Sequence, residues 1–405
     1  MRFFRLSMLI FFLMAIAGCI RDFEPEIGEI PGLDKPLVVI EGDIIVGGIT
    51  HVAVKTTRPV GSWQNTDITG NVVIWVESSR GEVWNGCEYS SGLDTSNYYL
   101  SGAKYMVDTR NLPHDGEYRL CVSIPDRGEY VSKFQPVLEC PPIDSIWYDI
   151  DENRSEARIN VATHDDTRDA GYYRWQFMET WNDKAIVPTE LKYNYITDEI
   201  ESLPYNEILK KNDCFVTWPS SSILLGNTED LKVNRIFEAT LQKIPRNEKK
   251  LLDTYCVAVV QMSLDKDGYV YWEQMKRNTS GNGGLFAPQP SEVNGNIMNA
   301  TCPSEYVIGY VNVSTISVGK MYVDWRKERM FDKGQCEDRL TVSKGDWGKT
   351  ALAGWVPLEV FWKKPETDKG EAVVSPVKMA VWVRDKCTST GSSCKERPVD
   401  WPFVY

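Results

Sequence analysis

The sequence predicts a mostly β protein. An N-terminal immunoglobulin-like antiparallel β-sandwich is expected over residues 35–142, followed by a second, larger β-rich domain with a short helix over residues 143–405. Two observations support this fold class. Short runs of β-branched and aromatic residues recur at close spacing, and Gly, Asp, Asn and Pro separate them. Aromatic residues make up 11% of the chain, which suits both sheet cores and ligand-binding surfaces.

The N-terminus has the layout of a secretory signal peptide over residues 1–18. Arg2 and Arg5 stand before an apolar run at residues 6–17, which Gly18 and Cys19 close. The run is shorter than the about 20 apolar residues of a membrane-spanning helix. It resembles the bacterial lipobox, which implies cleavage between Gly18 and Cys19 and lipidation of Cys19. Acyl chains there would hold the protein permanently on a membrane.

Residues 19–34 are expected to form a flexible tether between the lipid and the folded part. Asp22, Glu24 and Glu26 lie close to Cys19, and charged segments that carry Pro are usually flexible. This acidic stretch resembles the export tag of Bacteroidota lipoproteins, which implies an outer-membrane protein facing the cell exterior. The formal net charge of −12 argues against nucleic acid as a partner.

Five strand signals mark the first domain. They lie at residues 37–42, 51–55, 72–76, 116–124 and 130–134. Tyr118 invites comparison with the tyrosine corner of immunoglobulin sandwiches. Cys121 follows it by three residues, so strand alternation places the two side chains on opposite faces. An intersheet disulfide at Cys121 is therefore not expected. Pro141 and Pro142 mark the domain boundary.

The second domain carries further strand signals and one helical pattern. The strands are expected near residues 146–148, 157–161, 172–177, 306–313 and 380–383. The helix is expected over residues 263–276, with Asp265 or Asp267 able to cap its start. Tyr269, Trp272 and Met275 fall on one face of it, and such an aromatic stripe is more typical of a core than of a ligand site.

Residue patterns for catalysis or cofactor binding are scarce. The three His are far apart in sequence and from every Cys, so neither a metal site nor a cofactor is expected. No nucleophile motif of the GxSxG type occurs, and the prediction is a non-enzymatic protein. The many Asp and Glu residues leave one alternative open, a pair of carboxylates across a cleft as in glycosidases.

Two covalent modifications besides the lipid are expected. Cys387 and Cys394 flank a loop of small residues that a disulfide could close. Asp144-Ser145-Ile146 resembles the tripeptide at which periplasmic Bacteroidota proteins take O-glycans, which implies glycosylation of Ser145.

Ligand contacts are expected at the loop that follows the helix. Gly, Pro and Asn shape this loop, and loops on a rigid scaffold often bind ligands. The alternative is that the loop packs as part of the fold. The residues proposed to contact a ligand are Tyr271, Trp272, Phe286, Asn294 and Asn296.

Several stretches, in this order, resemble the domain-of-unknown-function 4249 family of Bacteroidota lipoproteins. They are residues 37–42, Gly116 to Tyr118, Gln261 to Trp272, Phe286 to Ile297, Gly309-Tyr310, Cys394, Pro398 and Trp401. The resemblance implies two β-rich domains, a lipid anchor and genes for TonB-dependent transporters nearby. The function hypothesis is a lipoprotein that binds a ligand for, or accompanies, such a transporter. The alternative is an adhesion or envelope-scaffold lipoprotein.

Overall fold

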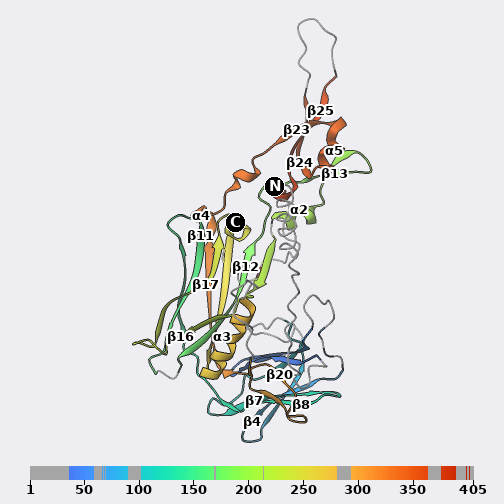
Figure 1. Ribbon diagram of the computed structural model, residues 1–405. Helices are drawn as coiled ribbons and strands as arrows, with labels where there is room; N and C mark the ends of the chain where they lie inside the picture. Colours follow the sequence, from blue (N-terminus) through green and yellow to red (C-terminus); the bar gives the residue numbers. More distant parts are fainter. Residues whose placement is uncertain are drawn as a thin grey trace, which may run out of the picture.

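The protein is elongated, with three units that follow one another along its long axis (Figure 1). The computed structural model describes residues 36–58, 66, 68, 70–89, 102–167, 170–212, 214–280, 293–363, 375–388, 398 and 401. About half of these residues lie in strands and few lie in helices, which confirms the mostly β class. None of the helices in this described part of the chain is long and apolar enough to cross a membrane.

The first unit has a ten-stranded sheet in the order β19-β8-β7-β4-β5-β6-β3-β1-β20, with β9 pairing beside β7, and a two-stranded sheet of β2 and β21. Every strand predicted for this domain is present. The strands are β1 (Val38–Glu41), β2 (Ile44–Ile45), β3 (Ile49–Thr56), β4 (Val73–Ser78), β5 (Val83–Glu88), β6 (Tyr105–Asp108), β7 (Glu117–Ile124), β8 (Gly128–Ser132), β9 (Gln135–Pro136), β19 (Ile297–Asn299), β20 (Val307–Ile308) and β21 (Val313–Ser314).

The ten-stranded sheet curls around one core. Tyr130 on β8 and Val307 on β20 stand near opposite ends of the strand order, yet both belong to the same buried cluster. The unit therefore differs from the two separate sheets of the expected immunoglobulin-like sandwich. Its tyrosine corner is nevertheless present, because the Tyr118 hydroxyl donates a hydrogen bond to the Pro113 carbonyl oxygen at 2.7 Å. Cys121 is buried with a free thiol, and no disulfide forms there.

The first unit is completed by a segment from far along the chain. β19 pairs with β8, and β20 pairs in parallel with β1, placing Val38 opposite Val307. Beside them, β21 pairs in parallel with β2. The predicted domain boundary at residue 142 assigned residues 297–314 to the second domain. These residues instead add strands to the first unit. Parallel pairing across so long a stretch leaves no local signal in the sequence.

The second unit is a sandwich of two sheets. One sheet has the order β10-β11-β17, and the other has β15-β12-β18-β22 with β16 beside β12. Apolar residues from both sheets, among them Ile159, Trp175 and Val257, share one core. The strands are β10 (Ile143–Ile150), β11 (Glu156–His164), β12 (Tyr172–Asn182), β15 (Phe215–Pro219), β16 (Leu224–Asn227), β17 (Arg235–Pro245), β18 (Thr254–Leu264) and β22 (Ile316–Asp324).

Helix α3 (Lys266–Ser280) follows β18 and confirms the predicted helix. Asp265 caps it by accepting a hydrogen bond from the Gly268 backbone N–H at 2.8 Å. Three short helical segments also belong to this region: α2 (Tyr205–Asn212), η1 (Lys249–Leu251) and α4 (Trp325–Glu328).

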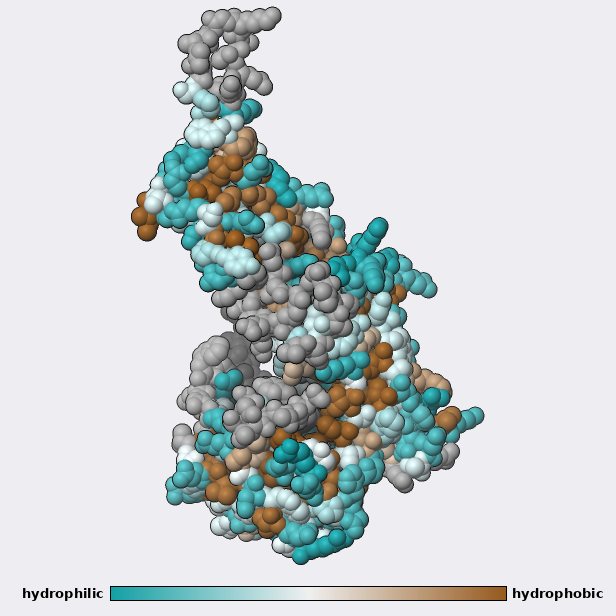
Figure 2. Space-filling model, turned by 180° about the vertical axis from the view of Figure 1, so that it is seen from behind, coloured by the Kyte–Doolittle hydropathy of each residue, from teal (hydrophilic) through white to brown (hydrophobic). Residues whose placement is uncertain are grey.

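The third, distal unit is built around the sheet β23-β25-β24. A hairpin inserted after β12 packs against it, because Tyr193 and Ile200 join a core with Trp347 and Trp382. Its elements are β13 (Leu191–Asn194), β14 (Glu199–Ser202), β23 (Leu340–Ser343), β24 (Trp355–Lys363), β25 (Val377–Arg384), η2 (Lys333–Cys336), η3 (Lys344–Asp346), α5 (Trp347–Leu352) and α6 (Asp385–Thr388). Figure 2 shows apolar residues on the outer surface of this unit, where Ile196, Leu352 and Trp362 are exposed.

Candidate ligand-binding site

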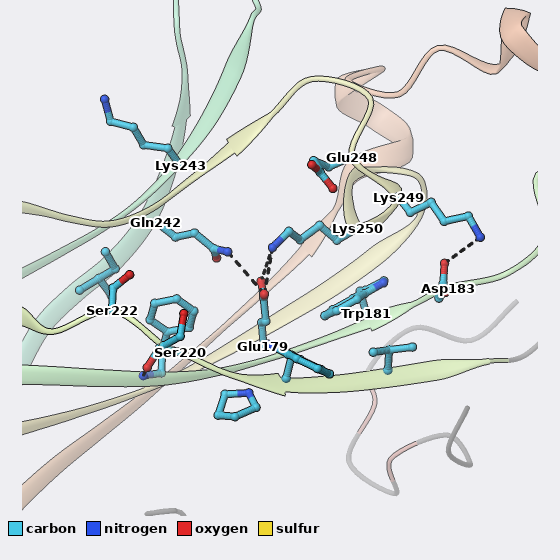
Figure 3. Close-up of a pocket in the computed structure, with 16 residues that line it drawn as sticks. Glu179, Trp181, Asp183, Ser220, Ser222, Gln242, Lys243, Glu248, Lys249 and Lys250 are labelled. Atoms are coloured by element: carbon cyan, nitrogen blue, oxygen red, sulfur yellow. Dashed lines mark hydrogen bonds and ion pairs between the residues drawn. The ribbon is translucent and has the colours of Figure 1, made fainter. Parts of the chain in front are cut away.

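A pocket of about 710 Å³ lies between the two sheets of the second unit. We call it the inter-sheet pocket (Figure 3). One wall comes from β12 and β15, and the other from β17 and the η1 segment. Its lining residues are Phe177, Glu179, Trp181, Asp183, Val216, Trp218, Pro219, Ser220, Ser221, Ser222, Leu241, Gln242, Lys243, Glu248, Lys249 and Lys250. Its volume is within the about 300–1,000 Å³ typical of small-molecule sites.

Glu179 stands at the centre of the pocket wall and is only 4% exposed. Lys250 donates to its two carboxylate oxygens at 2.9 and 3.1 Å, and the Tyr255 hydroxyl donates at 3.0 Å. Gln242 adds a longer contact at 3.4 Å. Burial, and then the Glu179 carboxylate, raise the pKa of the Tyr255 hydroxyl well above its usual range, so it remains a donor at neutral pH.

A second ion pair stands just after the end of β12. Asp183 is largely buried and contacts the Lys249 ammonium at 3.2 Å. Trp181 stands between Glu179 and Asp183 in the sequence, and the Lys250 ammonium lies 5.7 Å from the centre of its ring, within cation–π range. Because β12 alternates its faces, Phe177, Glu179 and Trp181 point into the pocket, and Asp183 lines it just after the strand ends.

Aromatic and hydroxyl groups flank the rim formed by β15 and the loop after it. Trp218 is 56% exposed, which is unusual for so large an apolar side chain. The loop is fixed at its start, because the Phe177 N–H donates to the Ser220 hydroxyl at 3.0 Å and the Ser220 N–H donates to the Phe177 carbonyl at 2.7 Å. Ser221 and Ser222 continue the lining.

The ligand contacts predicted on the helix lie away from this pocket. Tyr271 is buried in a small cluster with Val293 and Tyr310. Trp272 lies under the Arg174 guanidinium, 4.2 Å from the ring centre, and Arg174 contacts Asp43 of the first unit at 2.5 Å. Trp272 thus packs where the first two units meet, which agrees with the core role that its spacing with Tyr269 and Met275 favours. Tyr271 is outside that stripe and is buried beside it.

The two described residues of the predicted ligand-binding loop, Asn294 and Asn296, also lie outside the pocket. The Asn296 side chain is buried and exchanges two hydrogen bonds of 2.8 Å with the backbone of Val311, so it holds the fold. Asn294 is exposed outside the pocket. Gly295 and Gly309 approach so closely that a Cβ on Gly295 would collide with the Gly309 carbonyl oxygen. Phe286 is outside the described residues.

The predicted Cys387–Cys394 disulfide is wrong, because Cys387 is bonded to Cys336. Cys336 ends η2 and Cys387 lies in α6, just after β25, so the two meet in the distal unit although 51 residues separate them in sequence. A short separation in sequence is thus a poor guide to which cysteines pair, since a disulfide requires Cα atoms about 4.4–6.8 Å apart in space. Cys214 is also disulfide-bonded. Cys394, Gly18 and Cys19 lie outside the described residues.

Two further points concern a modification site and metal binding. Ser145 is exposed on β10, as a glycosylation site requires, and its modification stays a prediction. Among the described residues, no group of His, Cys, Asp and Glu is arranged to hold a metal ion.

The inter-sheet pocket was not predicted from the sequence. One signal was available in the alternation of apolar, acidic, aromatic and acidic residues at positions 177, 179, 181 and 183. A strand with carboxylates on its inward face breaks the usual apolar pattern. The cationic partners Lys249 and Lys250 lie about 70 residues later, and no local pattern joins them to β12.

The fold and the pocket define a mostly β protein with linked sheet units and a pocket of mixed polar and aromatic lining. The chain belongs to the family described as "Domain of unknown function (DUF4249)", whose model matches residues 20–319. The matched part includes the inter-sheet pocket and the segment that completes the first unit, whereas β23, β24 and β25 follow it. No curated protein matches the chain.

Proposed function

We propose that this chain is a non-enzymatic, lipid-anchored protein of the outer membrane that faces the cell exterior and binds a ligand for a TonB-dependent transporter. The observation that carries the binding role is the inter-sheet pocket. Its volume suits a small ligand, and rigid strands hold its polar groups in place.

The state of Glu179 supports binding rather than catalysis. Both of its oxygens already accept hydrogen bonds from Lys250, and Tyr255 supplies another. A general acid or base must instead exchange a proton with its substrate. The network therefore forms a fixed polar wall that can present groups to a ligand.

The anchor and the transporter partner rest on the sequence and the family. Residues 1–19 have the lipobox layout, and the acidic stretch after Cys19 supports export to the outer face. The family resemblance supports association with a transporter, because it implies that such genes lie nearby.

Affinity purification from detergent-solubilised outer membranes tests the partner. The full chain carries a C-terminal tag, and a fusion of residues 1–34 to an unrelated soluble reporter serves as the control. We expect a TonB-dependent transporter to co-elute at a stoichiometric level with the full chain only. Absence of a transporter, with cell adhesion lost when the gene is deleted, would instead favour the adhesion hypothesis.

A further inference from the structure

We infer that the inter-sheet pocket binds a neutral oligosaccharide. This inference rests on the proposed binding function and adds the chemical class of the ligand. It follows from three properties of the lining: its charge balance, its hydrogen-bonding groups and its tryptophans.

The charges that line the pocket balance. Three lysines and three carboxylates face it: Lys243, Lys249, Lys250, Glu179, Asp183 and Glu248. Lys250 is paired with Glu179 and Lys249 with Asp183, while Lys243 lies 3.6 Å from Glu156 of β11. An anionic ligand such as a phosphate ester would need cations in excess, and a cationic ligand would need carboxylates in excess. The pocket therefore suits an uncharged ligand.

The hydrogen-bonding groups suit a ligand that carries several hydroxyls. Lysine only donates and an ionised carboxylate only accepts, whereas a hydroxyl group can do both. A sugar ring can therefore contact both members of the Glu179–Lys250 pair and the serines of the rim. An apolar ligand would bury these groups without new partners, which costs free energy. A peptide carries fewer groups than a sugar that can both donate and accept hydrogen bonds.

The tryptophans supply the remaining surface that a sugar needs. One face of a pyranose ring presents C–H groups, which pack on the face of an indole. Trp218 is more than half exposed beside the serine loop, and Trp181 lies further along the same wall. The two rings come from paired strands, since Trp218 lies opposite Glu179 and Val216 opposite Trp181. The register therefore places both tryptophans on one face of the paired strands, two residues apart along them.

Affinity electrophoresis of the full chain in nonionic detergent tests the inference. Native gels would contain amylopectin, xyloglucan, galactomannan or arabinoxylan, with heparin and polygalacturonate as anionic probes and a casein digest as a peptide competitor. We expect retardation by at least one neutral polysaccharide, and release by its own oligosaccharides. Retardation by the anionic probes alone, release by the casein digest, or no retardation by any neutral polysaccharide would overturn the inference.

Two tryptophan variants locate the binding. Trp218→Ala should weaken retardation by roughly tenfold, because one stacking platform is lost. Trp362→Ala is the matched control: this residue is 66% exposed on the distal unit and should leave retardation unchanged. Because both side chains are exposed, neither substitution should change the thermal unfolding midpoint. Equal effects of the two variants would place binding elsewhere and overturn the inference.

The outcome is separable from that of the proposed function. If the transporter co-purifies but no neutral polysaccharide retards the chain, the ligand class is wrong and the transporter association stands. If a neutral polysaccharide retards the chain through Trp218 and no transporter co-purifies, the ligand class stands and the transporter association is wrong.

Discussion

The Tyr310 hydroxyl contacts both carboxylate oxygens of Asp265, at 2.7 and 2.8 Å. Asp265 also caps α3, and it accepts a hydrogen bond from the Gln135 side chain of the first unit at 3.1 Å. Burial, and then the Asp265 carboxylate, raise the pKa of the Tyr310 hydroxyl, so it stays protonated and donates. One carboxylate thus joins the helix start, the first unit and the segment that returns to it.

Removal of the Tyr310 hydroxyl should destabilise this junction. We expect Tyr310→Phe to lower the free energy of unfolding by about 1–2 kcal/mol, because a hydrogen bond to a charged group is lost where water is partly excluded. Urea unfolding measures the effect. Tyr205→Phe, at a side chain that is 75% exposed, is the control and should change stability by less than about 0.5 kcal/mol. Equal stability of the two variants would show that the junction contributes little.

The fold was predictable wherever local pattern decides structure. Alternation and β-branched runs located strands such as β3, β4 and β7, and Asp265, one of the two predicted candidates, caps α3. Tyr118 likewise forms the expected corner, because that contact spans only five residues. Each of these features depends on neighbours within one turn or one strand.

What escaped prediction depends on contacts between distant residues. The pairing of Val38 with Val307, the Cys336–Cys387 bond and the Glu179–Lys250 pair all join segments that pack together only after folding. The two-proline boundary suggested independent domains, but the chain returns to the first unit after completing most of the second. The pocket could not be predicted, because its walls come from two different sheets.

Loss of the Cys336–Cys387 disulfide should destabilise the distal unit. The bond closes a long loop, and a double Cys→Ser variant should lose about 3–4 kcal/mol of that unit's stability. Hydrogen exchange followed by mass spectrometry can resolve β23 to β25 from the other units. Cys302→Ser, at an exposed free thiol, is the control. Unchanged exchange in β25 of the double variant would contradict the assigned bond.

Cys19→Ala should release the protein from the membrane. The lipobox predicts acylation at this residue alone, and two or more acyl chains make anchoring stable. Metabolic labelling with a palmitate analogue, followed by fractionation, should show label and sedimentation for the parent chain and neither for the variant. Cys87→Ala, at an exposed free cysteine, should keep both. An unlabelled parent chain that still sediments would refute the anchor.

The carboxylate of Asp324 should make stability depend on acid pH. It accepts hydrogen bonds from the Arg326 side chain at 2.7 and 3.0 Å and from the Arg326 backbone N–H at 3.2 Å, which caps α4. The Arg326 guanidinium lowers the pKa of Asp324 below its usual value of 3.8. Because the folded-state pKa is depressed, the stabilisation is present above the unfolded-state pKa and is lost as pH falls through the folded-state pKa.

We therefore expect Asp324→Asn to lower the free energy of unfolding by about 1 kcal/mol at neutral pH, where the parent carboxylate is charged. The difference between variant and parent should shrink as pH falls below about 4, because the parent then loses the same charge. Urea unfolding at a series of pH values measures both. Glu152→Gln, at an exposed carboxylate, is the control and should show no such trend. A difference that grows at acid pH would contradict the assigned role of Arg326.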